Sequence, residues 1–223
     1  MAEPRRYAGY RVALGRFVKS GNADDARTAL GRWAARSSGG SSAGAQRLGR
    51  ATRTGGGAIS GLARAIAGVG PESGALDLRT LAGQPVDSAI AAILDAFMPA
   101  GIIDEVVARL AVEHALATAL KGVDTFDPSQ LSGNAVKVAT LAYVAELVFA
   151  QVVGDAGRSI AAAGPVAAAQ RERDIRRLVK EVVDFEGGPL ISDDNTVLTA
   201  KKMTGVVSRL VRETLKEMAS WSD

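Results

Sequence analysis

Apolar side chains recur at helical spacing along most of this chain, and that pattern constrains the fold more than any other feature. In residues 196–221 the row is formed by Val207, Leu210, Val211, Leu215 and Met218. Steps of three and four positions place such side chains on one face of an α-helix. Aromatic residues make up only 4% of the chain and hydrophobic residues 47%, so the core is expected to consist of Ala, Val, Leu and Ile. No strand pattern competes, and the sequence predicts an all-α fold.

Charge divides the chain into two parts of opposite sign. Residues 1–68 contain twelve Lys and Arg but only three acids, whereas residues 69–223 contain fifteen basic residues and twenty-one acids. Gly and Pro cluster between Gly68 and Gly74, where a boundary is expected. The sequence therefore predicts a basic, Gly/Arg-rich head of short helices (residues 1–68) and an acidic all-α bundle of about five helices (residues 69–223).

In the head, helices are expected over residues 5–19, 22–36 and 44–54. Asn22 or Asp24 can cap the second of them. Residues 37–43 (SSGGSSA) are flexible by composition. The triplet of residues 55–57 (GGG) is expected to break the chain before one more short helix.

In the bundle, helices are expected over residues 85–97, 102–120, 127–153, 166–185 and 196–221. Asp127 before Pro128 is typical of a helix start. The most apolar run, Val138 to Val153, is sixteen residues long and contains Glu146, which is too short and too polar for a bilayer span. We expect a soluble, cytoplasmic protein that makes no membrane contact.

The residue types and their spacing do not favour a catalytic or metal-binding site. The chain has no Cys and one His, so disulfides and thiolate metal sites are excluded and a zinc site is not expected. Asp104, Glu105, Glu113 and His114 are close in sequence, but Glu105, Arg109 and Glu113 are four apart, as in a helical salt-bridge ladder. His114 shares a predicted apolar face with Ile103, Val107 and Leu110. We expect no enzyme activity and no cofactor.

Two further motifs favour structural roles. The three glycines at 55–57 lack the Gly-Lys-Ser/Thr ending of a phosphate loop, and no strand precedes them. Asp193, Asp194 and Asn195 precede the last predicted helix and are typical of a cap.

The basic residues of the head are the candidate contacts for a partner. Arg47, Arg50 and Arg53 are three apart and are expected along one helix face. The full set of candidate contacts is Arg16, Lys19, Arg32, Arg36, Arg47, Arg50 and Arg53. These cations could follow a nucleic-acid backbone, bind an acidic protein, or serve solubility alone. The aromatic residues of the head fit helix packing better than base stacking.

Several short motifs occur in a fixed order along the chain: Arg16–Gly21 (RFVKSG), Ala29–Trp33 (ALGRW), Gly39–Ser41 (GGS), Gln46–Gly49 (QRLG), Arg53–Thr54, Leu81–Gly83 (LAG), Ile102–Glu105 (IIDE) and Ala108–Arg109. In these motifs the chain resembles the QatB family of the bacterial Qat anti-phage defence system. None of these motifs is catalytic. The resemblance extends loosely to the last helix.

The resemblance implies a non-enzymatic component of a four-protein defence operon. Its companions would be an ATPase, a protein similar to the queuosine-pathway enzyme QueC, and a TatD-like nuclease. The chain would then be a helical adaptor, or a protein substrate, for the QueC-like enzyme. Family members are expected to begin with a Gly/Ser-rich tail, whereas this chain begins Met1-Ala2-Glu3-Pro4, so no modification site is carried over.

Overall fold

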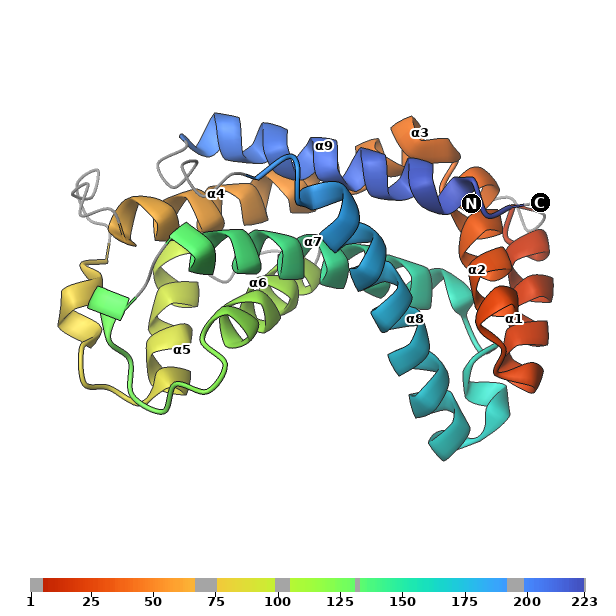
Figure 1. Ribbon diagram of the computed structural model, residues 1–223, viewed down its shortest axis with the longest axis horizontal. Helices are drawn as coiled ribbons and strands as arrows, with labels where there is room; N and C mark the ends of the chain where they lie inside the picture. The colour runs from red at the N-terminus through yellow and green to blue at the C-terminus, as the bar shows by residue number, and fades with distance from the viewer. Residues whose placement is uncertain (1–5, 67–75, 99–104, 131–132, 192–198, 223) are drawn as a thin grey trace. The chain divides into compact units, whose positions relative to one another are not determined.

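A computed structural model describes residues 6–66, 76–98, 105–130, 133–191 and 199–222. The described residues form nine α-helices joined by short π-helical and 3₁₀ segments (Figure 1). Within these ranges there is no strand, only an isolated bridge between Pro85 and Thr125. The all-α prediction is confirmed.

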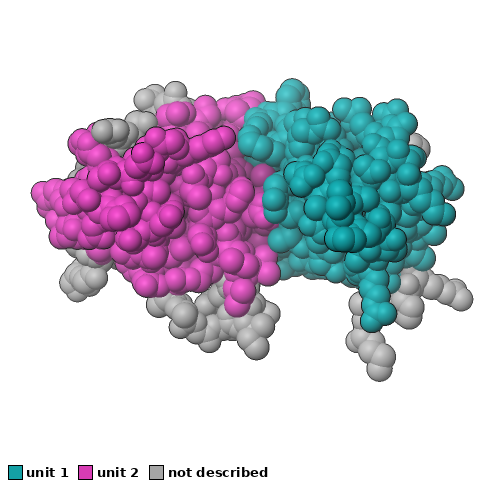
Figure 2. All heavy atoms as spheres, turned by 90° about the horizontal axis from the view of Figure 1, so that it is seen from below, with its two compact units in different colours: residues 1–48, 148–186, 209–223 teal, residues 49–147, 187–208 magenta. Residues whose placement is uncertain are grey.

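The chain is divided into two compact units, coloured separately in Figure 2. Unit 1 contains residues 1–48, 148–186 and 209–223, and unit 2 contains residues 49–147 and 187–208. The described residues of the predicted head belong to both units, which divide between Leu48 and Gly49. The predicted boundary between Gly68 and Gly74 lies outside the described residues.

Unit 1 combines the N-terminal helices with two segments from the second half of the chain. Its elements are α1 (Ala8–Ser20), α2 (Ala23–Arg32), the π-helix η1 (Trp33–Ser37), α3 (Gly40–Arg47), the end of α7 (Gly133–Ala156), η4 (Ala161–Ala163), most of α8 (Pro165–Gly187) and the end of α9 (Ala200–Ala219). Helix α1 packs against α2, with Tyr10, Leu14, Phe17 and Leu30 buried. The predicted cap of α2 is confirmed for Asn22, whose side chain accepts a 2.9 Å hydrogen bond from the Asp24 amide.

Unit 2 contains three mutually packed helices. Its elements are α4 (Gly49–Ile66), η2 (Leu78–Leu81), α5 (Val86–Phe97), α6 (Glu105–Ala119), η3 (Pro128–Gln130) and the first parts of α7 and α9. Helices α4, α5 and α6 contact one another in pairs. The buried side chains between them are mostly Ala, Leu and Ile, as the scarcity of aromatic residues requires.

The prediction that the glycines at 55–57 break the chain is wrong, because α4 continues through them to Ile66. A Cβ atom at Gly55 would overlap the ring of Tyr143, and one at Gly56 would lie 2.8 Å from Thr204 Oγ1. At Gly61 it would lie 2.5 Å from Phe97. These glycines permit close approach of neighbouring residues, and the resulting packing outweighs their low helix propensity.

Residues 37–43, predicted to be flexible by composition, contain the last residue of η1 and the first turn of α3. Ser37 ends η1, and α3 begins at Gly40. Helix α3 ends at Arg47 and α4 begins at Gly49. Arg47 therefore does not share a helix with Arg50 and Arg53, contrary to prediction.

Helix α7 starts later than predicted, at Gly133. Asp127 instead caps η3, since its Oδ1 accepts a 2.9 Å hydrogen bond from the Ser129 amide. By length and composition alone, residues Asn134–Ala156 are apolar enough to cross a membrane, and 61% of that segment's most apolar window is buried within the protein. The helices α5 and α8 agree closely with the predicted ranges.

Candidate functional site

The seven candidate cations are divided between the two units. Arg16 and Lys19 are exposed on α1, Arg32 is half-buried at the end of α2, and Arg36 is exposed in η1. Arg47 ends α3. These five belong to unit 1, whereas Arg50 and Arg53 are exposed on α4 in unit 2.

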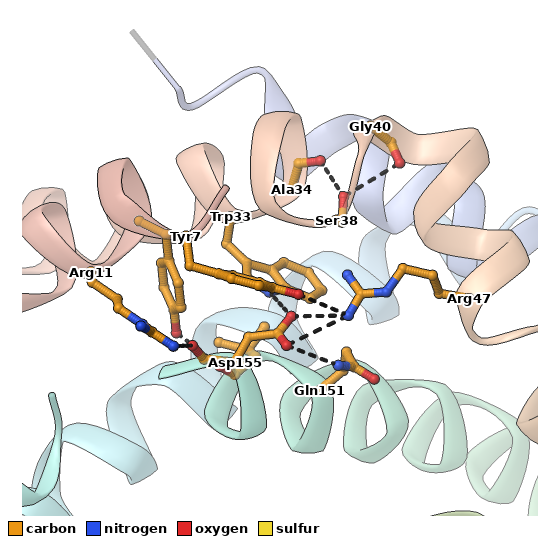
Figure 3. Close-up of polar contacts among 11 residues, drawn as sticks. Tyr7, Arg11, Trp33, Ala34, Ser38, Gly40, Arg47, Gln151 and Asp155 are labelled. Atoms are coloured by element: carbon orange, nitrogen blue, oxygen red, sulfur yellow. Dashed lines mark hydrogen bonds and ion pairs between the residues drawn. The ribbon is translucent and has the colours of Figure 1, made fainter. Parts of the chain in front are cut away.

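One of the seven, Arg47, enters a polar cluster around Asp155, near the end of α7 (Figure 3). The Asp155 carboxylate accepts a 3.0 Å hydrogen bond from Trp33 Nε1 and pairs with Arg47 Nη2 at 3.4 Å. Gln151 Nε2 donates to it at 3.3 Å. The Asp155 side chain is only 12% exposed. We call these four residues the Asp155 cluster.

Aromatic and basic side chains of the N-terminal helices surround the Asp155 cluster. Arg47 Nη2 also donates to Tyr7 Oη at 3.4 Å, and Arg11 lies 5.5 Å from the centre of the Tyr7 ring. Arg11 Nη2 approaches the Asp155 carbonyl oxygen at 3.5 Å, and Tyr10 Oη donates to the Val152 carbonyl at 2.9 Å. These contacts tie the first helices of unit 1 to the last turns of α7.

The π-helix η1 positions both Trp33 and Arg47. Ser38 N donates to the Trp33 carbonyl at 2.8 Å, the i→i+5 bond of a π turn. Ser38 Oγ also donates to the Ala34 carbonyl and lies 3.3 Å from the Gly40 carbonyl. Gly39 and Gly40 have φ values of 87° and 82°, which glycine adopts without strain. The chain thereby turns into α3, at whose end Arg47 reaches Asp155.

Electrostatics explain why Asp155 needs these donors. A carboxylate in the last turn of a helix is repelled by the partial negative charge of the helix C-terminus. The Arg47 guanidinium and the Trp33 and Gln151 N–H groups offset that repulsion. Burial, followed by the nearby Asp155 charge, raises the pKa of Tyr10 well above its ordinary value. Each polar side chain of the Asp155 cluster forms a hydrogen bond or ion pair with another group of the protein. The cluster therefore stabilises unit 1.

The acid and His group of α6 is arranged differently from the prediction. Arg109 Nη2 pairs with Asp95 Oδ1 at 2.5 Å, and its Nη1 donates to the Met98 carbonyl at 2.5 Å. His114 Nε2 lies 3.9 Å from Glu146 Oε2. Asp104 and the residues 193–195 lie outside the described residues, and nothing is described of the Glu105 side chain. Across the described ranges, no three acidic or His side chains gather where they could hold a metal ion.

His114 lies on the same face of α6 as Val107 and Leu110, as predicted, but that face is exposed and not part of the core. Ile103, predicted on the same face, lies outside the described residues. The buried face of α6 is formed by Ala108, Ala111, Val112, Ala115 and Leu116. The three alanines allow α6 to pack closely on α4 and α5. The face that carries them is therefore buried, and the face with the larger Val107 and Leu110 side chains is left exposed.

Sequence reasoning missed Asp155 and its partners. A carboxylate within the run Gly154–Gly157 (GDAG), at the expected end of a helix, was a usable signal, because an acid there requires donors. Gln151, four positions earlier, is a local donor, but Trp33 and Arg47 reach the carboxylate across more than a hundred positions of sequence.

Residues 39–218 match the family model described as Qat anti-phage system associated protein QatB. The chain belongs to the QatB family. A QatB protein is a component of an anti-phage defence system. No curated protein and no solved structure matches the chain. The matched range includes Arg47, Gln151 and Asp155 but begins after α1 and α2, so Trp33 and the tyrosines beside the Asp155 cluster precede it.

Proposed function

We propose that this QatB protein is a non-enzymatic helical adaptor that binds the QueC-like protein of the same defence operon. Two observations support the proposal: family membership and the outer surface of α1 in unit 1. The exposed surface of α1 is the observation that indicates where the partner binds.

Helix α1 presents a basic row to solvent. Val12, Arg16 and Lys19 are exposed and lie three or four positions apart, so they share one face. No acidic residue occurs in the helix. The opposite face is fixed in the core by Tyr10, Leu14 and Phe17. An apolar side chain beside basic ones, on a helix that packing holds rigid, fits an acidic protein surface.

Co-purification tests this proposal. The full chain is produced with its three operon companions, and the QueC-like protein is expected to co-purify with it in a fixed ratio. The double variant Arg16→Glu/Lys19→Glu is expected to weaken that binding about tenfold or more, because opposite charges across an interface accelerate association.

Arg209→Glu/Arg212→Glu is the matched control. It changes the charge by the same amount on exposed positions of α9 in the same unit. If both variants lost the same amount of binding, net charge alone, and not the surface of α1, would explain the loss. A wild-type chain that binds none of the companions would refute the adaptor function.

Nucleic-acid binding is the second candidate, because the same exposed cations of α1 could follow a phosphate backbone. A titration with DNA and RNA at two salt concentrations tests it, and Arg16→Ala/Lys19→Ala is expected to lower the affinity and the salt dependence. Arg47 is a poor choice for this test, since its guanidinium is part of the Asp155 cluster. Affinity unchanged in the double variant would exclude this use of α1.

A further inference from the structure

Helix α6 exposes large apolar side chains on consecutive turns. Val106, Val107 and Leu110 are 54%, 44% and 58% exposed. They make up three of the six large exposed hydrophobic residues in the described part of the chain. Single exposed apolar residues are ordinary on protein surfaces, but a contiguous group marks an interaction site.

The exposed row has the spacing of a helix-packing seam. Val107, Leu110, His114 and Ala117 are all exposed and follow one another at intervals of three, four and three positions. This is the a/d repeat with which one helix packs along another. The buried face of α6 already packs on α4 and α5, so the exposed row is not needed for the core of unit 2.

Two acidic side chains lie beside the row. Glu113 is exposed next to it, and Glu146 of α7 lies 3.9 Å from His114. The Arg109 guanidinium is turned toward Asp95 and the carbonyl oxygens at the end of α5. We propose that this row, with Glu113 at its rim, is a docking surface for an amphipathic helix of a partner protein that carries Lys or Arg beside its apolar stripe. The identity of that partner as an operon product rests on the proposed function.

A second copy of this chain fits the row less well. Antiparallel pairing of two α6 helices centred on Leu110 would place each Glu113 opposite the Val107 of the other copy. Parallel pairing in register would place each Glu113, at a g position, beside Thr118 of the other copy, which offers the carboxylate no positive charge. A partner helix with Lys or Arg opposite Glu113 avoids both of these unfavourable arrangements.

The test measures the affinity of the full chain for the purified QueC-like protein. Leu110→Asp and Glu113→Lys are each expected to weaken binding at least tenfold, and Glu113→Gln less than Glu113→Lys. Val166→Asp is the control, because Val166 is 83% exposed on α8; it is expected to bind as the wild type does. Circular dichroism and thermal melting verify that each variant is folded. Wild-type affinity in Leu110→Asp would overturn the inference, and the adaptor function would stand if Arg16→Glu/Lys19→Glu still weakened binding.

A photo-crosslinking amino acid at position 110 gives a second readout that does not depend on the QueC-like protein being the partner. The complete operon is expressed, and a crosslink to a basic helix of any operon product would support the inference. A crosslink to a second copy of the chain, or none at all, would overturn it. If the wild type binds no QueC-like protein but position 110 crosslinks to another companion, the proposed partner is wrong and the docking surface stands.

Discussion

Trp33 Nε1 and Asp155 Oδ2 are joined by a hydrogen bond of 3.0 Å across 122 positions of sequence. The bond connects the start of η1 with the last turn of α7. The carboxylate is also paired with Arg47 and is mostly buried. Substitution of Asp155 is therefore expected to lower the stability of unit 1.

Asp155→Ala is expected to lower the free energy of unfolding by about 2–3 kcal/mol, because the Trp33 N–H and the Arg47 guanidinium both lose a buried acceptor. Asp155→Asn should cost about 1 kcal/mol, since its amide oxygen can still accept from Trp33. Urea unfolding followed by tryptophan fluorescence measures both. Glu181→Ala, at an exposed position of α8, serves as control and should change stability by less than about 0.5 kcal/mol. Equal stability of Asp155→Ala and the wild type would show that the Asp155 cluster contributes nothing.

Gly55→Ala is expected to destabilise the protein by about 1–3 kcal/mol or more, because its Cβ would overlap the Tyr143 ring and force it aside. Gly57→Ala, two positions along α4, meets no atom within 4 Å and should stabilise the helix by about 0.5–1 kcal/mol. Thermal melting of the two variants should therefore shift in opposite directions. Two shifts of the same sign would contradict the close approach of Tyr143 to α4.

Thr214→Val is expected to raise the free energy of unfolding by about 1 kcal/mol. Thr214 Oγ1 is buried in α9 and has no hydrogen-bond partner among the described residues, and burying an unpaired hydroxyl is costly. Thr140→Val is the comparison, because Thr140 Oγ1 donates to the Val136 carbonyl at 2.7 Å. That second variant should lose stability. Destabilisation by Thr214→Val would mean that its hydroxyl has a partner after all.

Two of the three tyrosines should make the fold sensitive to alkali. Burial raises the pKa of Tyr10 and of Tyr143 above the ordinary value of about 10. The neutral phenol is thus favoured in the folded state, so the full stability is present below about pH 10 and declines above it, by about 1.4 kcal/mol per pH unit for each tyrosine. Urea unfolding at about pH 8 and about pH 11 measures this decline. In Tyr10→Phe the decline should be shallower, and an unchanged slope would rule out the contribution of Tyr10.

The helical periodicity of the sequence was sufficient to predict the fold class and the ranges of α5 and α8, where apolar rows and their stops agree. The periodicity failed for α4, because its glycines favour a break in the helix by their local propensity. The helix continues because these glycines allow close contacts with Tyr143, Thr204 and Phe97. The periodicity also failed for α6, where two faces compete and the one with small alanines is buried. Among the candidate cations, spacing could not show that Arg47 belongs to a different helix from Arg50 and Arg53. In the Asp155 cluster, the contacts with Trp33 and Arg47 are tertiary, and local sequence does not encode them.

The separation of Trp33 from Asp155 also bears on how the protein is made. Unit 1 draws on residues 1–48, 148–186 and 209–223. During synthesis, α1 and α2 leave the ribosome long before the segments that complete their core. The parts of α1 and α2 that contact these later segments, such as Tyr10 beside Val152, therefore stay exposed while about a hundred residues of unit 2 are added. We expect nascent chains of QatB to depend on chaperones until the last turns of α9 have emerged.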